Sequence, residues 1–131
     1  MPGRGKKNDY AQALKDCSPL AKDGNPEAQF TLGVMYYYGN GVPQDYKESM
    51  RWYRLAAEQG DADAQFTLGS IYRNGQGVPQ DYKEAVRWYR LAAGQGNDGA
   101  QNSLAAMYDE GHGVPQDYVQ AYLWFDLAIA S

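Results

Sequence analysis

The sequence predicts an all-α protein, a solenoid of stacked helix–loop–helix repeats with about seven helices. Three observations support this fold class. The string Gly-Val-Pro-Gln-Asp-Tyr occurs at residues 41–46, 77–82 and 113–118, a constant period of 36 residues (77 − 41 = 113 − 77). Apolar and aromatic residues on either side of the string keep the same period. Within each unit they recur at helical spacing, which is typical of helical repeat arrays.

The first helix of each repeat, called helix A, is expected at 26–38, 62–74 and 98–110. Asn25 is a good N-cap, and Pro26 suits the first helical position because its missing N–H would be unsatisfied there in any case. The later repeats carry the caps Asp61 and Asn97. Along the first helix A, three apolar positions spaced four residues apart predict one buried face: Ala28, Leu32 and Tyr36.

Glycine inside helix A predicts a close contact between helices. Gly33 and Gly69 occupy equivalent mid-helix positions, where glycine costs about 1 kcal/mol relative to alanine. A residue that weakens the helix in two repeats is explained if a neighbouring helix leaves no room for a side chain. Ala105 stands at this position in the third repeat.

The loop after helix A ends it with glycines and a proline, and a second helix, helix B, then begins. Asp45 with Glu48 is a capping-box pair for helix B, and the two later repeats carry Asp81 with Glu84 and Asp117 with Gln120. Gly60 and Gly96 are expected to end helix B with positive φ. A phosphate-loop reading of Gly-Asn-Gly-Val-Pro-Gln is rejected, because the Gly-Lys-Ser/Thr ending and a preceding strand are missing.

The repeat also reaches the N-terminus. Gly3 and Gly5 fall one period before the loop glycines Gly39 and Gly41, so the chain is expected to open inside such a loop. Residues 9–24 are then a helix B without its helix A. The predicted organisation is a single repeat domain over 1–131, in which this orphan helix precedes three complete repeats at 25–60, 61–96 and 97–131.

The repeated motifs A-x3-L-G-x2-Y, G-x-G-V-P-x-D-Y and A-x2-W-Y-x-L-A-A-x-x-G resemble the Sel1-like repeat family, a relative of the tetratricopeptide repeats. The resemblance covers nearly the whole chain. It implies a right-handed α/α superhelix whose A helices line the concave side, and work as an adaptor for protein complexes, often in bacteria. Ser49 and Ala105 depart from the family's preferred Ala and Gly, and only packing detail is expected to change.

Composition excludes some partners and leaves the compartment open. A net charge of −4 is unfavourable for binding nucleic acid, and the short basic run Arg4, Lys6, Lys7 reads as a solvated tail. No apolar stretch is long enough for membrane insertion. Nothing near Met1 resembles a signal peptide. A cytoplasmic location is therefore favoured, and a periplasmic or secreted one stays open if a signal peptide has been removed.

The sequence offers no group for catalysis, and we expect no enzyme, metal or cofactor. His112 stands in a loop where the other repeats have Asn40 and Gln76, so it reads as a solvated position. Cys17 aligns with Tyr53, which predicts a buried core thiol rather than a nucleophile. Some members of the family are associated with β-lactam binding or hydrolysis. The Ser-x-x-Lys motif of that chemistry is absent, which leaves this a distant alternative.

Variable positions on an otherwise constant framework predict a binding groove for a protein or peptide partner. By resemblance to tetratricopeptide geometry, the variable residues of helix A point toward the concave surface. The groove runs from aromatic through cationic to acidic, and its expected residues are Phe30, Val34, Tyr37, Tyr38, Phe66, Ser70, Arg73, Asn74, Asn102, Asp109 and Glu110. The alternative is that these positions vary because nothing constrains them in solvent.

The last helix B differs from the other two. Leu123 and Asp126 stand where the second repeat has Arg87 and Arg90, and the helix is apolar on nearly every side. A terminal solenoid helix normally keeps a polar face. We therefore predict an association face that contacts a second copy in a homodimer or a further segment: Val119, Leu123, Phe125 and Ile129. An ordinary apolar end left by truncation is the alternative reading.

Taken together, the sequence favours a non-enzymatic scaffold that binds a peptide or protein segment in the groove of stacked repeats. A self-associating structural module is the second reading.

Overall fold

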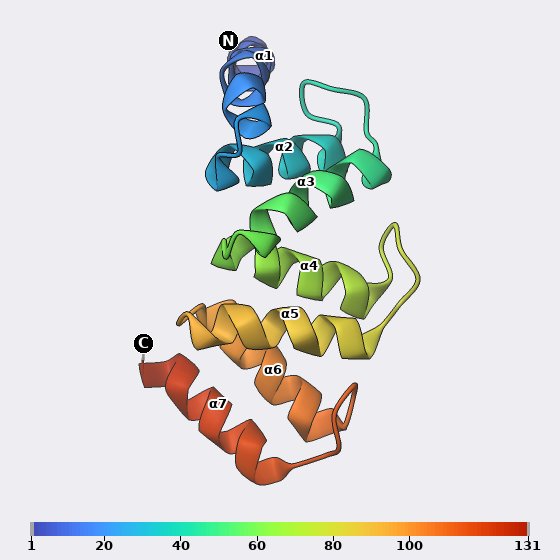
Figure 1. The fold of residues 1–131 in the computed structure, drawn as a ribbon, viewed down its shortest axis with the longest axis vertical. Helices are drawn as coiled ribbons and strands as arrows, with labels where there is room; N and C mark the ends of the chain where they lie inside the picture. Colours follow the sequence, from blue (N-terminus) through green and yellow to red (C-terminus); the bar gives the residue numbers. More distant parts are fainter. Residues whose placement is uncertain (1, 131) are drawn as a thin grey trace. The chain divides into compact units, whose positions relative to one another are not determined.

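The computed structural model describes the backbone of residues 2–130 and the side chains of residues 9–130. This part of the chain is all-α (Figure 1), with the helices α1 (Pro2–Lys22), α2 (Pro26–Tyr38), α3 (Tyr46–Glu58), α4 (Ala62–Asn74), α5 (Tyr82–Gly94), α6 (Asp98–Glu110) and α7 (Tyr118–Ala130). The fold class and the bounds predicted for α2, α4 and α6, the A helices, are confirmed.

The helices form two compact units, Met1–Asp61 and Ala62–Ser131. In the first unit α1 packs on α2 and α2 on α3. In the second unit α4 packs on α5, α5 on α6 and α6 on α7. Within each unit the helices therefore pack on their neighbours in sequence, as in a helical repeat array. The right-handed superhelical sense stays a prediction.

Side-chain caps begin α2, α3, α5, α6 and α7 as the sequence predicts, while the cap expected from Asp61 at α4 stays a prediction. Asn25 Oδ1 accepts from the N–H of Ala28 at 2.9 Å, and the third repeat repeats this bond at Asn97. Asp45 Oδ1 accepts from the N–H of Glu48, but the reciprocal half of the capping box is absent. The Asp45 N–H instead donates to the carbonyl of Tyr36, which closes the loop back onto α2.

The mid-helix glycines mark close contacts between helices, as predicted. A Cβ placed on Gly33 would lie 2.5 Å from Cδ1 of Tyr53, and one on Gly69 would lie 2.7 Å from the same atom of Tyr89. Ala85 adds a backbone contact at the second site, because its carbonyl oxygen would be 3.2 Å from that Cβ. Each glycine therefore lets a tyrosine ring of helix B lie directly on the backbone of helix A.

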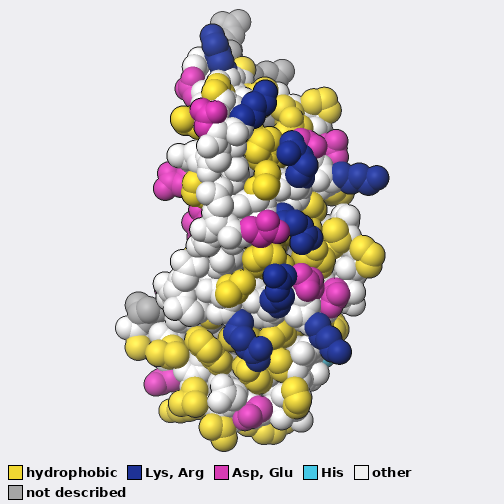
Figure 2. Space-filling view, viewed as in Figure 1, with side chains coloured by type: hydrophobic (Ala, Val, Ile, Leu, Met, Phe, Trp, Pro, Cys, Tyr) yellow, Lys and Arg dark blue, Asp and Glu magenta, His cyan; other side chains and the backbone are white. Residues whose placement is uncertain are grey.

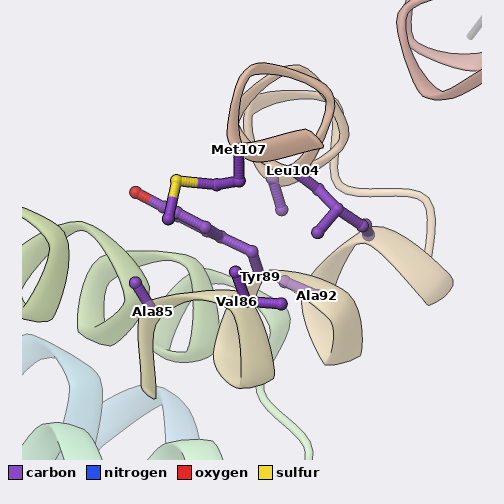
Figure 3. Close-up of a cluster of buried hydrophobic side chains, with 8 residues drawn as sticks. Ala85, Val86, Tyr89, Ala92, Leu104 and Met107 are labelled. Carbon is purple, nitrogen blue, oxygen red and sulfur yellow. The ribbon is translucent and has the colours of Figure 1, made fainter. Parts of the chain in front are cut away.

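Each unit has its own hydrophobic core. In the second unit the core joins α5 to α6, and Figure 3 shows Tyr89 and Val86 of α5 lying against Met107 and Leu104 of α6. In the first unit the core is built from one helix end, α2 and a tryptophan of α3: Ala21, Ala28, Leu32, Met35 and Trp52.

Two expectations at the N-terminal end are wrong. α1 begins at Pro2, so residues 2–8 are helical rather than part of a loop. In the complete repeats the loop is held by bonds to the preceding helix A, such as the one from Asp45 to Tyr36. Cys17 is half-buried rather than buried, and it lies at the edge of the first core.

Candidate protein-binding surfaces

The first unit gathers aromatic side chains around Tyr53. The ring centroid of Phe30 lies 5.6 Å from that of Tyr53, and Tyr37 lies 6.5 Å from it. Tyr37 also contacts Tyr38 and Tyr46, each at 5.0 Å between centroids. Tyr38 is 65% exposed, while Phe30 and Tyr37 are half-buried. The predicted aromatic residues therefore do come together, and they present one partly exposed apolar surface.

Tyr53 is the buried floor of this aromatic surface. Its ring is 2% exposed, and burial raises the pKa of its phenol. Burial also raises the pKa of Tyr37, and the phenols of Tyr46 and Tyr38 raise it further. Ser49, one of the family departures, donates its hydroxyl to the carbonyl of Gly33 at 2.6 Å in the same buried region. Serine at position 49, where the family prefers alanine, therefore adds a hydrogen bond between α2 and α3.

In the second unit two predicted groove residues lie on the equivalent tyrosine. Phe66 packs on Tyr89 with 5.9 Å between ring centroids, and the hydroxyls of Ser70 and Tyr89 are 3.0 Å apart. Phe66 also fills space beside Gly99, where a Cβ would lie 2.9 Å from its ring. Phe66 is thus partly a core residue. The sequence did carry a signal, because Gly99 stands where the earlier repeats have Glu27 and Asp63.

The polar groove residues of the second unit are accessible. Arg73 and Ser70 are half-buried, whereas four others are exposed: Asn74, Asn102, Asp109 and Glu110. Val34, in the first unit, is half-buried.

His112, predicted as a merely solvated residue, makes specific contacts. Its ring stacks on Tyr82 at 4.4 Å between centroids, and its Nδ1 lies 3.0 Å from Oε2 of Glu110. The loop after α6 is therefore tied to the start of α5.

The predicted association face on α7 is exposed. Val119 is 69% exposed, Leu123 50%, Phe125 38% and Ile129 82%. The helix carries one charged residue, Asp126, and no Lys or Arg. Among the side chains of α7, Ala121 is buried.

Comparison with α5 divides the exposed apolar residues of α7, which include this face, into two stripes. The first, called the stacking stripe, consists of Tyr118, Tyr122, Phe125 and Ile129. Its counterparts in α5 pack against α6: Tyr82, Val86, Tyr89 and Ala93. The second, called the outer stripe, consists of Val119, Leu123 and Leu127. Its counterparts in α5 are exposed although a further helix follows: Lys83, Arg87 and Leu91. A following helix A therefore explains the apolar stacking stripe but not the outer stripe.

Two features bear on other classes of function. Among the side chains of residues 9–130, no three His, Cys, Asp or Glu lie close enough to hold a metal ion. None of the helices in the described range has the length and apolar character needed to cross a membrane.

Comparisons with known proteins agree with the repeat geometry. The model of the Sel1 repeat matches residues 26–61, 62–97 and 99–131. A protective antigen of uropathogenic Escherichia coli strains that displays the same repeat fold is 43% identical, with a TM-score of 0.89 over 92% of this chain. The chain spans about a quarter of that antigen, 26% of its length. No curated protein matches.

Two further solved structures are similar. A Sel1 repeat protein from Oxalobacter formigenes is 40% identical with a TM-score of 0.84, and the match covers 89% of this chain and 88% of that one. Cysteine rich protein B of Helicobacter pylori is 22% identical, with a TM-score of 0.73, over 95% of this chain and 89% of the other; it shares the fold. The three matches to the repeat model cover most of the sequence, and the chain belongs to the Sel1 repeat family.

Proposed function

We propose that this chain is a non-enzymatic scaffold that binds a peptide or protein segment along its A helices. The observation that carries the proposal is the aromatic surface of the first unit. Tyr38 keeps 65% of its surface in solvent beside the half-buried rings of Phe30 and Tyr37. Aromatic residues of this kind are enriched at protein interfaces, because they bury a large area at low entropic cost.

The chemistry of the groove residues suggests the chemistry of the partner. Apolar side chains of a partner suit the aromatic surface. A basic segment suits Asp109 and Glu110, the exposed carboxylates at the end of α6. Matching charge in this way raises the association rate and selects the partner's orientation.

Affinity capture with matched variants tests the proposal. Tyr37 packs on three other aromatic rings, so its removal would also disturb the fold. The exposed Tyr38 is the better choice, and we expect Tyr38→Ala with Arg73→Ala to lose the captured partner. The control pair Leu20→Ala with Lys15→Ala removes one exposed apolar side chain and one cation from α1.

The partner should be quantified by mass spectrometry, with urea unfolding to show that both double variants are folded. Equal recovery of the partner by the two double variants would contradict binding at the groove residues. Hydrolysis of nitrocefin by the purified chain would contradict the proposal that the scaffold is non-enzymatic.

Self-association through α7 is the second candidate function. The outer stripe favours it, because it is apolar at positions where α5 carries Lys83 and Arg87. We infer that a second copy covers this face. Seven large apolar side chains of α7 are 38–82% exposed. Large exposed apolar patches of this kind mark protein interaction sites.

A further inference from the structure

The exposed face of α3 carries an arginine that lies over a tryptophan ring. The Arg51 guanidinium lies 4.4 Å from the ring centroid of Trp52 and is ion-paired with Glu48. More than half of the Arg51 side chain stays in solvent, 54%. Beside it lies a pocket of about 460 Å³ lined by Ala21, Lys22, Gln29, Arg51, Trp52 and Leu55.

The same arrangement recurs on α5 in the second unit. Arg87 lies 4.6 Å from the ring centroid of Trp88, pairs with Glu84 at 3.0 Å and is 57% exposed. A pocket of about 540 Å³ adjoins it, lined by Arg87, Arg90 and Leu91. Arg90 donates to the hydroxyl of Tyr108 at 2.7 Å, which fixes a second guanidinium at this site. We call these two sites, each formed by Arg, Trp and Leu of a helix B, the Arg–Trp surface.

The tryptophans of this surface are not explained by packing alone. Trp52 is 6% exposed and Trp88 2%, and neither indole N–H finds an acceptor among the described residues. A buried donor without a partner costs free energy that a phenylalanine would avoid. Tryptophan is, however, the best aromatic platform for a cation. At these two sites the indole also gives the arginine a platform, and an oriented guanidinium loses less entropy when it binds a carboxylate.

Charge on the helices points to the sign of the partner. α5 carries three Lys or Arg against one Glu, in a chain whose net charge is −4. α2, α4 and α6 carry one cation in total, Arg73. Figure 2 shows Lys and Arg side chains with hydrophobic side chains beside them on the face in view. Each site of the Arg–Trp surface thus combines an arginine with an exposed leucine, Leu55 or Leu91, on a chain of net negative charge.

We propose that each of the two sites of the Arg–Trp surface binds an acidic segment of a partner protein that also carries apolar side chains. At the α3 site a carboxylate of the segment pairs with Arg51 and an apolar side chain covers Leu55. At the α5 site the same contacts are made to Arg87 and Leu91, and neither site shares a residue with the proposed groove. Charge complementarity selects an acidic protein segment, and the net negative charge of the chain is unfavourable for RNA.

The three tryptophan indole N–H signals in a nitrogen-15 NMR spectrum test the proposal site by site. The probe is a synthetic peptide in which glutamates alternate with leucine and phenylalanine. We expect saturable shifts of the Trp52 and Trp88 signals and none of Trp124, because α7 has Leu123 in place of the arginine. A peptide with glutamine for every glutamate, and an oligouridylate, are the comparison ligands.

Matched variants of the first unit complete the test. Arg51→Gln should weaken binding at Trp52 about three- to tenfold, the loss expected for one partly exposed charge-assisted contact. Arg51→Lys should fall between it and the unmodified chain. Lys15→Gln removes the same charge from exposed α1 and should change nothing. Unmoved Trp52 and Trp88 signals, equal binding of the glutamine peptide or the oligouridylate, or an equal effect of Lys15→Gln would each overturn the proposal.

Discussion

At the scale of single residues, the contact between Gly33 and Tyr53 controls how closely α2 and α3 approach. The ring of Tyr53 occupies the space that a Cβ at position 33 would need, 2.5 Å from Cδ1. The buried hydroxyl of Ser49 fixes the same two helices through the Gly33 carbonyl. The floor of the aromatic surface is therefore positioned by a missing side chain and one hydrogen bond.

We expect Gly33→Ala to lower the free energy of unfolding by about 1–3 kcal/mol, because the new methyl group overpacks the contact with Tyr53. Gly94→Ala is the matched control. It lies at the end of α5 with no atom within 4 Å of a new Cβ, so it should be neutral or stabilise by about 0.4–1 kcal/mol. Urea unfolding measures both changes. Equal effects of the two substitutions would show that helix propensity, and not the close approach, selects glycine at position 33.

Residue patterns predicted the local interactions better than the longer-range ones. Asn25 and Asp45 cap their helices as their side-chain chemistry predicts. The reciprocal half of the capping box fails because the Asp45 N–H is already bonded to Tyr36 across the loop. Similarly, Phe66 was assigned to the groove because it varies, although part of its ring fills the space beside Gly99. Local sequence patterns do not include such tertiary partners.

At the scale of elements, α7 is a helix B whose outer positions have lost their charge. In α5 the equivalent positions hold Lys83 and Arg87, and the arginine covers a tryptophan. In α7 the same positions hold Val119 and Leu123, which are 69% and 50% exposed. An exposed apolar face of this extent favours association.

Restoring the charged residues of α5 should separate the copies. We expect Val119→Lys with Leu123→Arg to shift the chain to a monomer in sedimentation velocity, without a loss of unfolding free energy. Leu20→Arg, which replaces a leucine 51% exposed on α1, should leave the association unchanged. The second candidate function fails if the unmodified chain is monomeric at high concentration, or if the α1 variant dissociates it equally.

The A helices were predicted closely, because local signals mark their ends: α2 and α6 each have an N-cap asparagine and a C-terminal glycine in the left-handed conformation. α2, α4 and α6 have the predicted bounds. The start of α1 was not predicted, since the period placed Gly3 and Gly5 in a loop. The 36-residue period identifies equivalent residues in different repeats. It does not show whether the hydrogen-bond partners that hold the loop are present in each of them.

At the scale of the whole molecule, contacts between sequential helices explain why the sequence predicted the fold class. Within each unit the helices pack on their neighbours in the chain. A repeat that buries its apolar face on the next repeat therefore specifies the architecture locally. The binding surfaces were harder to predict than the fold. A residue that varies between repeats can contact a partner, a neighbour in the core or solvent, and its variability looks the same in each case. Phe66 and Tyr38 illustrate two of these outcomes.

The measurement that tests the scaffold function most directly is amide hydrogen exchange of the chain, alone and with the partner identified by affinity capture. The groove account predicts slower exchange in α2, α4 and α6, with the largest change near Tyr38 at the end of α2. Slower exchange confined to α3, α5 or α7, with the A helices unchanged, would contradict it.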